Sequence, residues 1–207
     1  LATTSAIPAA GDDATAIAAD ISDKGACKEL IADVVSRFGG IDVLVNNAGI
    51  NRRGPLLDLT DEDWEMTMRV NVDSMFHLCR AAIPHMIEAG GGAIVNTASI
   101  AGLVADPGMA PYVAAKHGVI GLTKAGAMDY ARQNIRVNAL APGFVQTPMT
   151  QRWIDDPAFM RMLIAHSPVG RAAQPEEIVG MVLYLCSDLA TFTTGQTFVV
   201  DGAQTAH

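Results

Sequence analysis

The chain has 207 residues, of which 50% are hydrophobic and 17% charged, which is enough to bury a core as a single domain. Fourteen basic residues against twenty-two acidic ones give a net charge of −8, which argues against nucleic acid as a partner but not against a local basic pocket. No apolar run reaches the roughly 18 residues that span a bilayer, so we expect a soluble protein with no membrane partner.

Cysteine and histidine spacing argues against a metal site or a disulfide framework. Cys27, Cys79 and Cys186 are far apart and form no CxxC or Cys/His pattern. The five histidines have no metal-binding spacing either, so we predict no metal. An odd number of isolated cysteines favours a reducing compartment, and we predict a cytoplasmic location.

Hydrophobic periodicity predicts strands and helices that alternate along the chain. The expected strands are 14–19, 41–45, 93–98, 135–141 and 197–200. The expected helices are 25–38, 62–88, 110–132 and 175–187, with Thr60 and Asp63 as a capping pair before the second. Because crossovers between parallel strands are right-handed, this order predicts one α/β domain with a doubly wound parallel sheet.

A tyrosine and a lysine stand out in the helix predicted over 110–132. Tyr112 and Lys116 are four residues apart, so their side chains emerge on one helical face. A free phenol has a pKa of about 10. A neighbouring ammonium is expected to lower this pKa and make Tyr112 a usable acid or base. Taken alone, the pair also fits an ordinary half-buried phenol and a solvated amine.

Polar or glycine-rich turns follow three of the predicted strands: 46–49, Ser99 and Pro142-Gly143. In an open parallel sheet, ligands bind at the carboxyl ends of the strands. The three turns therefore indicate a ligand site at one edge of the sheet.

These motifs together resemble the short-chain dehydrogenase/reductase family over essentially the whole chain. Asn46-Asn47-Ala48-Gly49 matches its NNAG segment, and Ser99, Tyr112 and Lys116 match its Ser-Tyr-x-x-x-Lys set. Asn71, the turn Pro142-Gly143 with Thr147, and the final TGQTFVVDG match its other motifs. Any one piece is weak, whereas all of them in order and at family spacing are specific.

The resemblance implies a Rossmann-like fold and an NAD(P)-dependent oxidoreductase that moves a hydride between nicotinamide and a secondary alcohol or ketone. Tyr112 exchanges the proton with the substrate oxygen, and Ser99 holds that oxygen. Lys116 lowers the tyrosine pKa and binds the nicotinamide ribose, while Asn71 holds a water that relays the proton. For Ser99 a helix cap, and for Asn71 a satisfied core amide, are the structural alternatives.

The resemblance also implies the cofactor contacts. Asp20 faces the adenine, and Asn47, Ala48 and Gly49 line the adenosine side. Pro142, Gly143, Val145 and Thr147 meet the nicotinamide end, alongside Tyr112 and Lys116. The alternative for Asp20 is an acid at a helix N-terminus, and for Thr147 a loop hydroxyl without a ligand.

The segment 144–170 follows the Pro142-Gly143 turn, where the family places its substrate lid, and it carries Trp153 and Phe159. Ordinary core helices are the alternative there. The pair Arg52-Arg53 after the NNAG segment either faces an anionic substrate or forms a solvated loop pair.

The family's opening strand, glycine-rich turn, helix and second strand have no counterpart before residue 14. We therefore expect the first β-α-β unit to be missing from this chain; the alternative is that the first strand is repositioned. The residue that separates NAD from NADP lies in that region, so the predicted cofactor is NAD or NADP.

The motifs favour oxoacyl-carrier-protein-reductase-like or sugar- or cyclic-alcohol-dehydrogenase-like branches, and relatives suggest a homotetramer. The alternative function is a catalytically inactive cofactor-sensing or interaction protein on the same fold. The complete set of Asn71, Ser99, Tyr112 and Lys116 argues against it, because a binding protein has no need of proton transfer.

Overall fold

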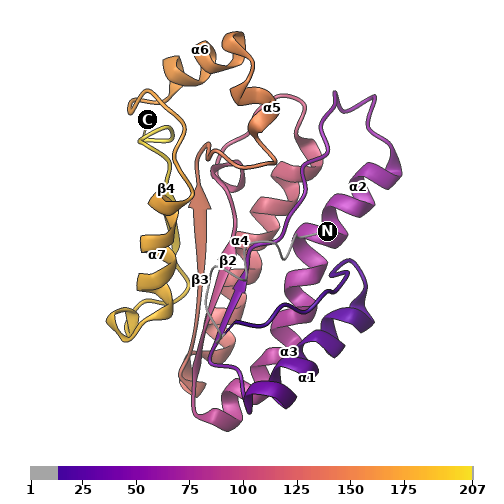
Figure 1. Cartoon of the computed structure of the whole chain (residues 1–207), viewed down its shortest axis with the longest axis vertical. Helices are drawn as coiled ribbons and strands as arrows, with labels where there is room; N and C mark the ends of the chain where they lie inside the picture. The colour runs from indigo at the N-terminus through magenta and orange to yellow at the C-terminus, as the bar shows by residue number, and fades with distance from the viewer. Residues whose placement is uncertain (1–13, 207) are drawn as a thin grey trace.

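The computed structural model describes residues 14–206 as a parallel sheet with helices on both faces (Figure 1). Its four strands run in the order β1-β2-β3-β4. They are β1 (Val43–Asn46), β2 (Gly92–Thr97), β3 (Ile135–Pro142) and β4 (Thr197–Val200), and each neighbouring pair is parallel. The predicted α/β fold with a parallel sheet is confirmed.

Helix α1 (Lys24–Phe38) precedes β1, and the other helices connect the strands. These are α2 (Asp61–Met68) and α3 (Ser74–Ala89) between β1 and β2, α4 (Ala110–Tyr130) between β2 and β3, and α5 (Gln151–Ile154), α6 (Pro157–His166) and α7 (Glu176–Cys186) between β3 and β4. The predicted capping pair is present: the Thr60 hydroxyl accepts the Asp63 amide, and the Asp63 carboxylate accepts the Thr60 amide.

The core lies on both faces of the sheet because successive side chains of a strand point in opposite directions. On β2, Ile94 packs with residues of α1, α3 and α4, whereas Val95 packs with Leu140 of β3 and Leu185 of α7. Figure 1 shows α7 on one side of the sheet and α3 and α4 on the other. This double burial explains why the strands are almost continuously apolar.

The strand predicted over 14–19 is wrong. Residues 14–20 are irregular, and the four described strands pair only with one another. An apolar run becomes a strand only when a neighbour accepts its backbone hydrogen bonds, and no described strand does so for this run. The other predicted strands and helices, apart from 62–88, begin and end within two residues of their observed bounds.

The helix predicted over 62–88 is interrupted by a π-helical segment, Arg69–Asp73, between α2 and α3. Side chains compete for backbone carbonyls there: the Asn71 amide donates to the Thr67 carbonyl, and the Ser74 hydroxyl donates to the Val70 carbonyl. π-Bulges of this kind concentrate at functional sites. The segment therefore marks Asn71 as more than a helical position.

None of the described helices is both long and apolar enough to cross a membrane.

Candidate active site

The three turns predicted to form a ligand site lie at one edge of the sheet. β1, β2 and β3 are parallel and in register, with Asn46 opposite Asn96 and Thr97 opposite Leu140, so their carboxyl ends coincide. Ser99 follows β2, and the other two turns follow β1 and β3. Ligands of parallel sheets bind at this edge.

Tyr112 and Lys116 face each other on the first two turns of α4, with the Lys116 Nζ atom 5.5 Å from the centroid of the Tyr112 ring. The Ser99 side chain acts on the Tyr112 phenol as a hydrogen-bonding neighbour that lowers the pKa of the phenol. Ser99 also caps the short 3-10 turn Ile100–Gly102, because its hydroxyl accepts the Ala101 amide at 3.1 Å. The capping alternative and the contact with Tyr112 therefore hold together.

The Lys116 ammonium is buried, with 3% of the residue exposed. Burial lowers its pKa to about 8, because a charged amine loses its hydration. Nζ donates a hydrogen bond of 2.6 Å to the Thr97 carbonyl at the end of β2. The solvated-amine alternative is therefore wrong.

Burial raises the pKa of the Tyr112 phenol, and the hydrogen bond with Ser99 opposes this rise only in part. The sequence predicts the reverse, a pKa lowered by Lys116. The direction differs because desolvation penalises the phenolate more than the neighbouring groups stabilise it in this structure. Tyr112 is thus held as a neutral phenol that can donate a proton.

Asn71 ties the π-helical segment to the loop after β1. Its side-chain amide donates to the Ile50 carbonyl at 2.9 Å, and its side-chain oxygen accepts the Ile50 amide at 3.2 Å. The residue is fully buried. These bonds satisfy it as a core amide, and they also fix the loop that lies beside Lys116.

Gly49 lies where Asn71 and Lys116 come closest to this loop. A Cβ atom at position 49 would lie 2.6 Å from the Asn71 side-chain oxygen and 3.7 Å from Lys116 Nζ. Glycine is therefore required here by a contact within the protein. The place of Gly49 at the adenosine side of the cofactor stays a prediction.

Comparison with known proteins agrees with this geometry. The family described as Enoyl-(Acyl carrier protein) reductase matches residues 2–205. The 3-oxoacyl-[acyl-carrier-protein] reductase FabG of Thermotoga maritima is 41% identical over 183 residues, covering 88% of this chain and 74% of the relative. The chain belongs to the short-chain dehydrogenase/reductase family.

Two further relatives represent the dehydrogenase side of this family. The gluconate 5-dehydrogenase of Gluconobacter oxydans is 41% identical over 186 residues, covering 90% of this chain and 73% of the relative. The crystal structure of a gluconate 5-dehydrogenase from Burkholderia cenocepacia, in complex with NADP and tartrate, superposes with a TM-score of 0.88 at 40% identity. It covers 91% of this chain and 74% of that one. The comparisons confirm the predicted family, the oxidoreductase class and a nicotinamide cofactor.

Asp20, which the sequence places at the adenine of the cofactor, forms hydrogen bonds within the protein. The Asp20 carboxylate accepts the amide and hydroxyl of Ser22, which lowers its pKa. Asp23, not Asp20, caps α1. Asp20 therefore lies in the turn before that helix, and its contact with the adenine stays a prediction.

The turn after β3 is packed closely against the end of β4. A Cβ atom at Gly143 would lie 2.8 Å from the Asp201 Cα atom. Thr147 and Thr150 form a hydroxyl pair at 3.1 Å, and the Thr150 hydroxyl donates to the Val145 carbonyl. These bonds shape the loop that begins at Pro142 and leaves the sheet edge.

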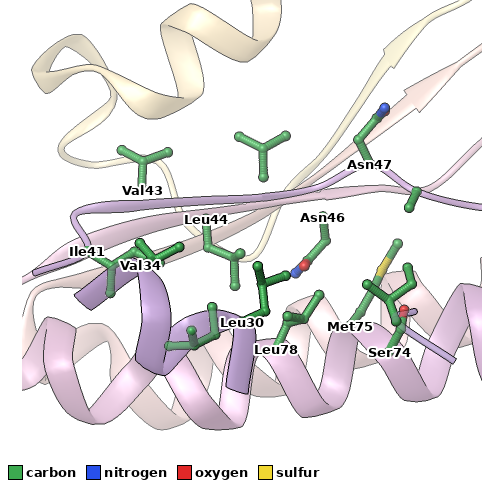
Figure 2. A pocket seen from close by; sticks show the side chains of 14 residues that line it. Leu30, Val34, Ile41, Val43, Leu44, Asn46, Asn47, Ser74, Met75 and Leu78 are labelled. Carbon is green, nitrogen blue, oxygen red and sulfur yellow. The ribbon is translucent and has the colours of Figure 1, made fainter. Parts of the chain in front are cut away.

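An apolar groove of about 370 Å³ runs along β1 toward α1 and α3 (Figure 2). Leu30, Leu44 and Leu78 line it, while Asn46 and Asn47 form its polar end. Ser99, Tyr112 and Lys116 do not line this groove. Only its polar end adjoins the sheet edge that carries Ser99, Tyr112 and Lys116.

Sequence reasoning missed Thr97. Its carbonyl accepts from Lys116, and its hydroxyl donates to the Asn47 side chain at 3.1 Å. Thr97 thus connects the NNAG segment to the buried ammonium. Its position two residues before Ser99, at the end of a strand, is the signal that could have identified it.

Proposed function

We propose that the protein transfers a hydride between NAD or NADP and a secondary alcohol or its ketone, with Tyr112 as the proton donor and acceptor. The observation that carries this proposal is the convergence of Ser99, Tyr112 and a buried Lys116 at the carboxyl edge of the sheet. A phenol, a hydroxyl and an ammonium in one place suit proton exchange with a carbonyl oxygen.

Lys116 is suited to a ribose diol. An ammonium has three donors, and among the described residues only the Thr97 carbonyl accepts one of them within hydrogen-bond distance. The two other donors are available to hydroxyl oxygens. The nicotinamide cofactor supplies the hydride, and the protein supplies position and charge.

The other roles follow from the same contacts. Ser99 orients the substrate oxygen toward the Tyr112 phenol, and Lys116 stabilises the phenolate when the proton leaves. Asn71 fixes the loop beside Lys116 and holds the water that returns the proton. We place Asp20, Asn47, Ala48 and Gly49 at the adenosine side of the cofactor, and Pro142, Gly143, Val145 and Thr147 at its nicotinamide end.

The substrate belongs to the oxoacyl, sugar or cyclic-alcohol type. The names of the relatives support two of these types: a 3-oxoacyl reductase supports the oxoacyl type, and the gluconate 5-dehydrogenases support the sugar type. The segment 144–170 serves as the substrate lid, because its aromatic residues cluster beside the turn at Gly143. A lid that excludes water favours hydride transfer.

The active form is a homotetramer in the cytoplasm. Exposed apolar side chains on α4 and α7, such as Met128 at 85% and Leu183 at 64%, support contacts between subunits. Three free cysteines support a reducing compartment. Light scattering on the purified protein measures the tetramer directly.

A spectrophotometric assay tests the function. With a panel of ketones and secondary alcohols, the protein is expected to change the absorbance of NADH or NADPH. Tyr112→Phe keeps the ring but removes the proton, so we expect turnover to fall by about 10²–10⁴ with an unchanged melting temperature. Tyr130→Phe, near the far end of α4, serves as the control and retains activity.

Two outcomes contradict the proposal. Unchanged turnover in Tyr112→Phe rules out the phenol as proton donor. Cofactor binding without turnover on any ketone or alcohol favours the alternative, an inactive cofactor-sensing protein.

A further inference from the structure

Two arginines contact one aromatic ring of the segment 144–170. The guanidinium carbon of Arg152 lies 4.2 Å from the centroid of the Trp153 ring, and that of Arg53 lies 4.9 Å from it. Arg152 and Trp153 belong to α5, after β3, whereas Arg53 belongs to the loop after β1. Since β2 lies between β1 and β3, the contact spans the end of the strand that leads to Ser99.

The loop that carries Arg53 is also tied to the segment before Tyr112. The Gly54 amide donates to the Gly108 carbonyl at 3.1 Å, and α4 begins two residues later. The backbone next to Arg53 is therefore held beside the start of the helix that carries Tyr112. The cationic side chain itself is placed by its contact with Trp153, and we call this contact and its surroundings the rim of the proposed site.

The Trp153 ring is itself held in place by two other aromatic side chains. Its centroid lies 6.1 Å from that of Phe159 and 6.5 Å from that of Phe144, and Phe144 follows Gly143 directly. Stacking on an aromatic face orients a guanidinium while leaving its N–H donors free. The rim thus offers positioned donors beside an apolar wall.

Nearby carboxylates do not neutralise this pair. Among residues 14–206, no carboxylate oxygen lies within 4.0 Å of the guanidinium of Arg53 or Arg152. The two acids closest in sequence have other partners: Asp155 accepts from Gln151, and Asp156 caps α6. Two uncompensated positive charges at one point stand out in a chain with a net charge of −8.

We infer that Arg53, assisted by Arg152, binds the carboxylate of a small hydroxy or keto acid whose reacting carbon lies at Ser99 and Tyr112. The inference rests on the proposed function and narrows its substrate class. A guanidinium binds a carboxylate through two parallel hydrogen bonds, which fixes the orientation of the acid as well as its affinity. The Trp153 wall contacts the carbon chain between the carboxylate and the reacting carbon.

The test compares hydroxy acids with their uncharged amides of the same carbon skeleton, in the wild type and in Arg53→Gln. Loss of a charged hydrogen bond is worth about 1.5–3 kcal/mol, or roughly ten- to a hundredfold in KM. We expect that increase in KM for the acids and unchanged kinetic constants for the amides. Arg152→Gln is expected to give a smaller change of the same kind, and Arg53→Lys an intermediate one.

Arg80→Gln is the matched control. Arg80 is also exposed and also lies over an aromatic ring, that of Phe76, but it lies on α3, outside the rim. We expect this variant to keep the wild-type preference for acids. Binding of succinate, followed by Trp153 fluorescence in a Trp64→Phe background, gives a readout that does not depend on turnover.

Equal effects of Arg53→Gln on acids and amides, or no effect on either, would overturn the inference. So would a wild-type enzyme that reduces oxoacyl thioesters of acyl carrier protein but no small acid, although the proposed function would then stand. No turnover with any alcohol or ketone would overturn the proposed function itself. Succinate binding that depends on Arg53 would still support the carboxylate site in that case.

Discussion

The proposed catalytic residues and the segment 144–170 border the same edge of the sheet but are packed differently. Asn71 and Lys116 are 0% and 3% exposed and bond to backbone carbonyls of neighbouring elements. In the segment 144–170, Met149, Met162 and Ile164 are 44–51% exposed, and only Leu163 and Ser167 are buried. Rigid packing suits a proton transfer that needs fixed geometry, whereas an open segment can change its contacts with little cost to the fold.

The largest effect is expected when the buried positive charge of Lys116 is removed. Lys116→Met keeps the length of the side chain but loses the ammonium, so we expect turnover to fall by at least about a hundredfold. Steady-state rates with saturating cofactor measure this effect. Lys124→Met, on an exposed position of the same helix, is the control that retains activity.

The same variant has a signature in the pH dependence of stability. The pKa of Lys116 is about 8 in the folded protein and 10.5 for an unperturbed lysine, so the unfolded state binds more protons between these values. The free energy of unfolding therefore rises from pH 8 to about 10.5 in the wild type through this group. Denaturant titrations should show this contribution lost in Lys116→Met and retained in Lys124→Met; equal slopes in all three proteins would contradict it.

A methyl group at the loop beside Asn71 tests whether that region is as rigid as its packing indicates. Gly49→Ala puts a Cβ atom 2.6 Å from the Asn71 side-chain oxygen, so we expect a loss of about 1–3 kcal/mol in the free energy of unfolding. Gly40→Ala, which meets nothing within 4 Å, should change stability by less than about 0.5 kcal/mol. Similar losses in both variants would show that the loop adapts.

The smallest effect on the fold is expected in the segment 144–170. Phe159→Ala removes a ring that packs on Trp153 and Phe144, and so removes part of the apolar wall that we propose for the substrate. We expect KM to rise several-fold while the free energy of unfolding falls by less than the 3–5 kcal/mol typical of a core Phe→Ala change. Phe192→Ala, at a fully exposed ring outside this segment, is the control. A full core-type loss of stability in Phe159→Ala would mean that the segment is core and not lid.

Local patterns predicted most of the fold, and long-range contacts account for what they missed. Apolar runs bounded by glycine identified β1, β2 and β3, and the Thr60–Asp63 pair identified the start of α2. The run at 14–19 is apolar, as those strands are, but an apolar pattern does not reveal whether a neighbouring strand is available to pair with it. Whether a pairing strand is available depends on the arrangement of the whole sheet and not on the residues of the segment.

In the candidate site, too, local patterns predicted some features, whereas others depend on long-range contacts. Helical spacing alone brought Tyr112 and Lys116 together, and the topology of parallel strands brought Ser99 to them. The direction of the Tyr112 pKa was wrong because it depends on burial, which spacing does not report. The contact of Arg53 with Trp153 joins residues a hundred positions apart, and no local pattern indicates such a pair.

The π-helical segment at Arg69–Asp73 has a consequence for anyone who draws α2 and α3 as one continuous helical wheel. One extra residue in a turn shifts the azimuth of everything after it by about 100°. Thr67 and Leu78 are eleven residues apart, which an uninterrupted α-helix would place about 20° apart, so a wheel drawn without the offset gives the wrong angle between α2 and α3. Deletion of a single residue in this segment would rotate α3 relative to α2 about the helix axis. We therefore expect the tolerance to insertions and deletions to be lowest there.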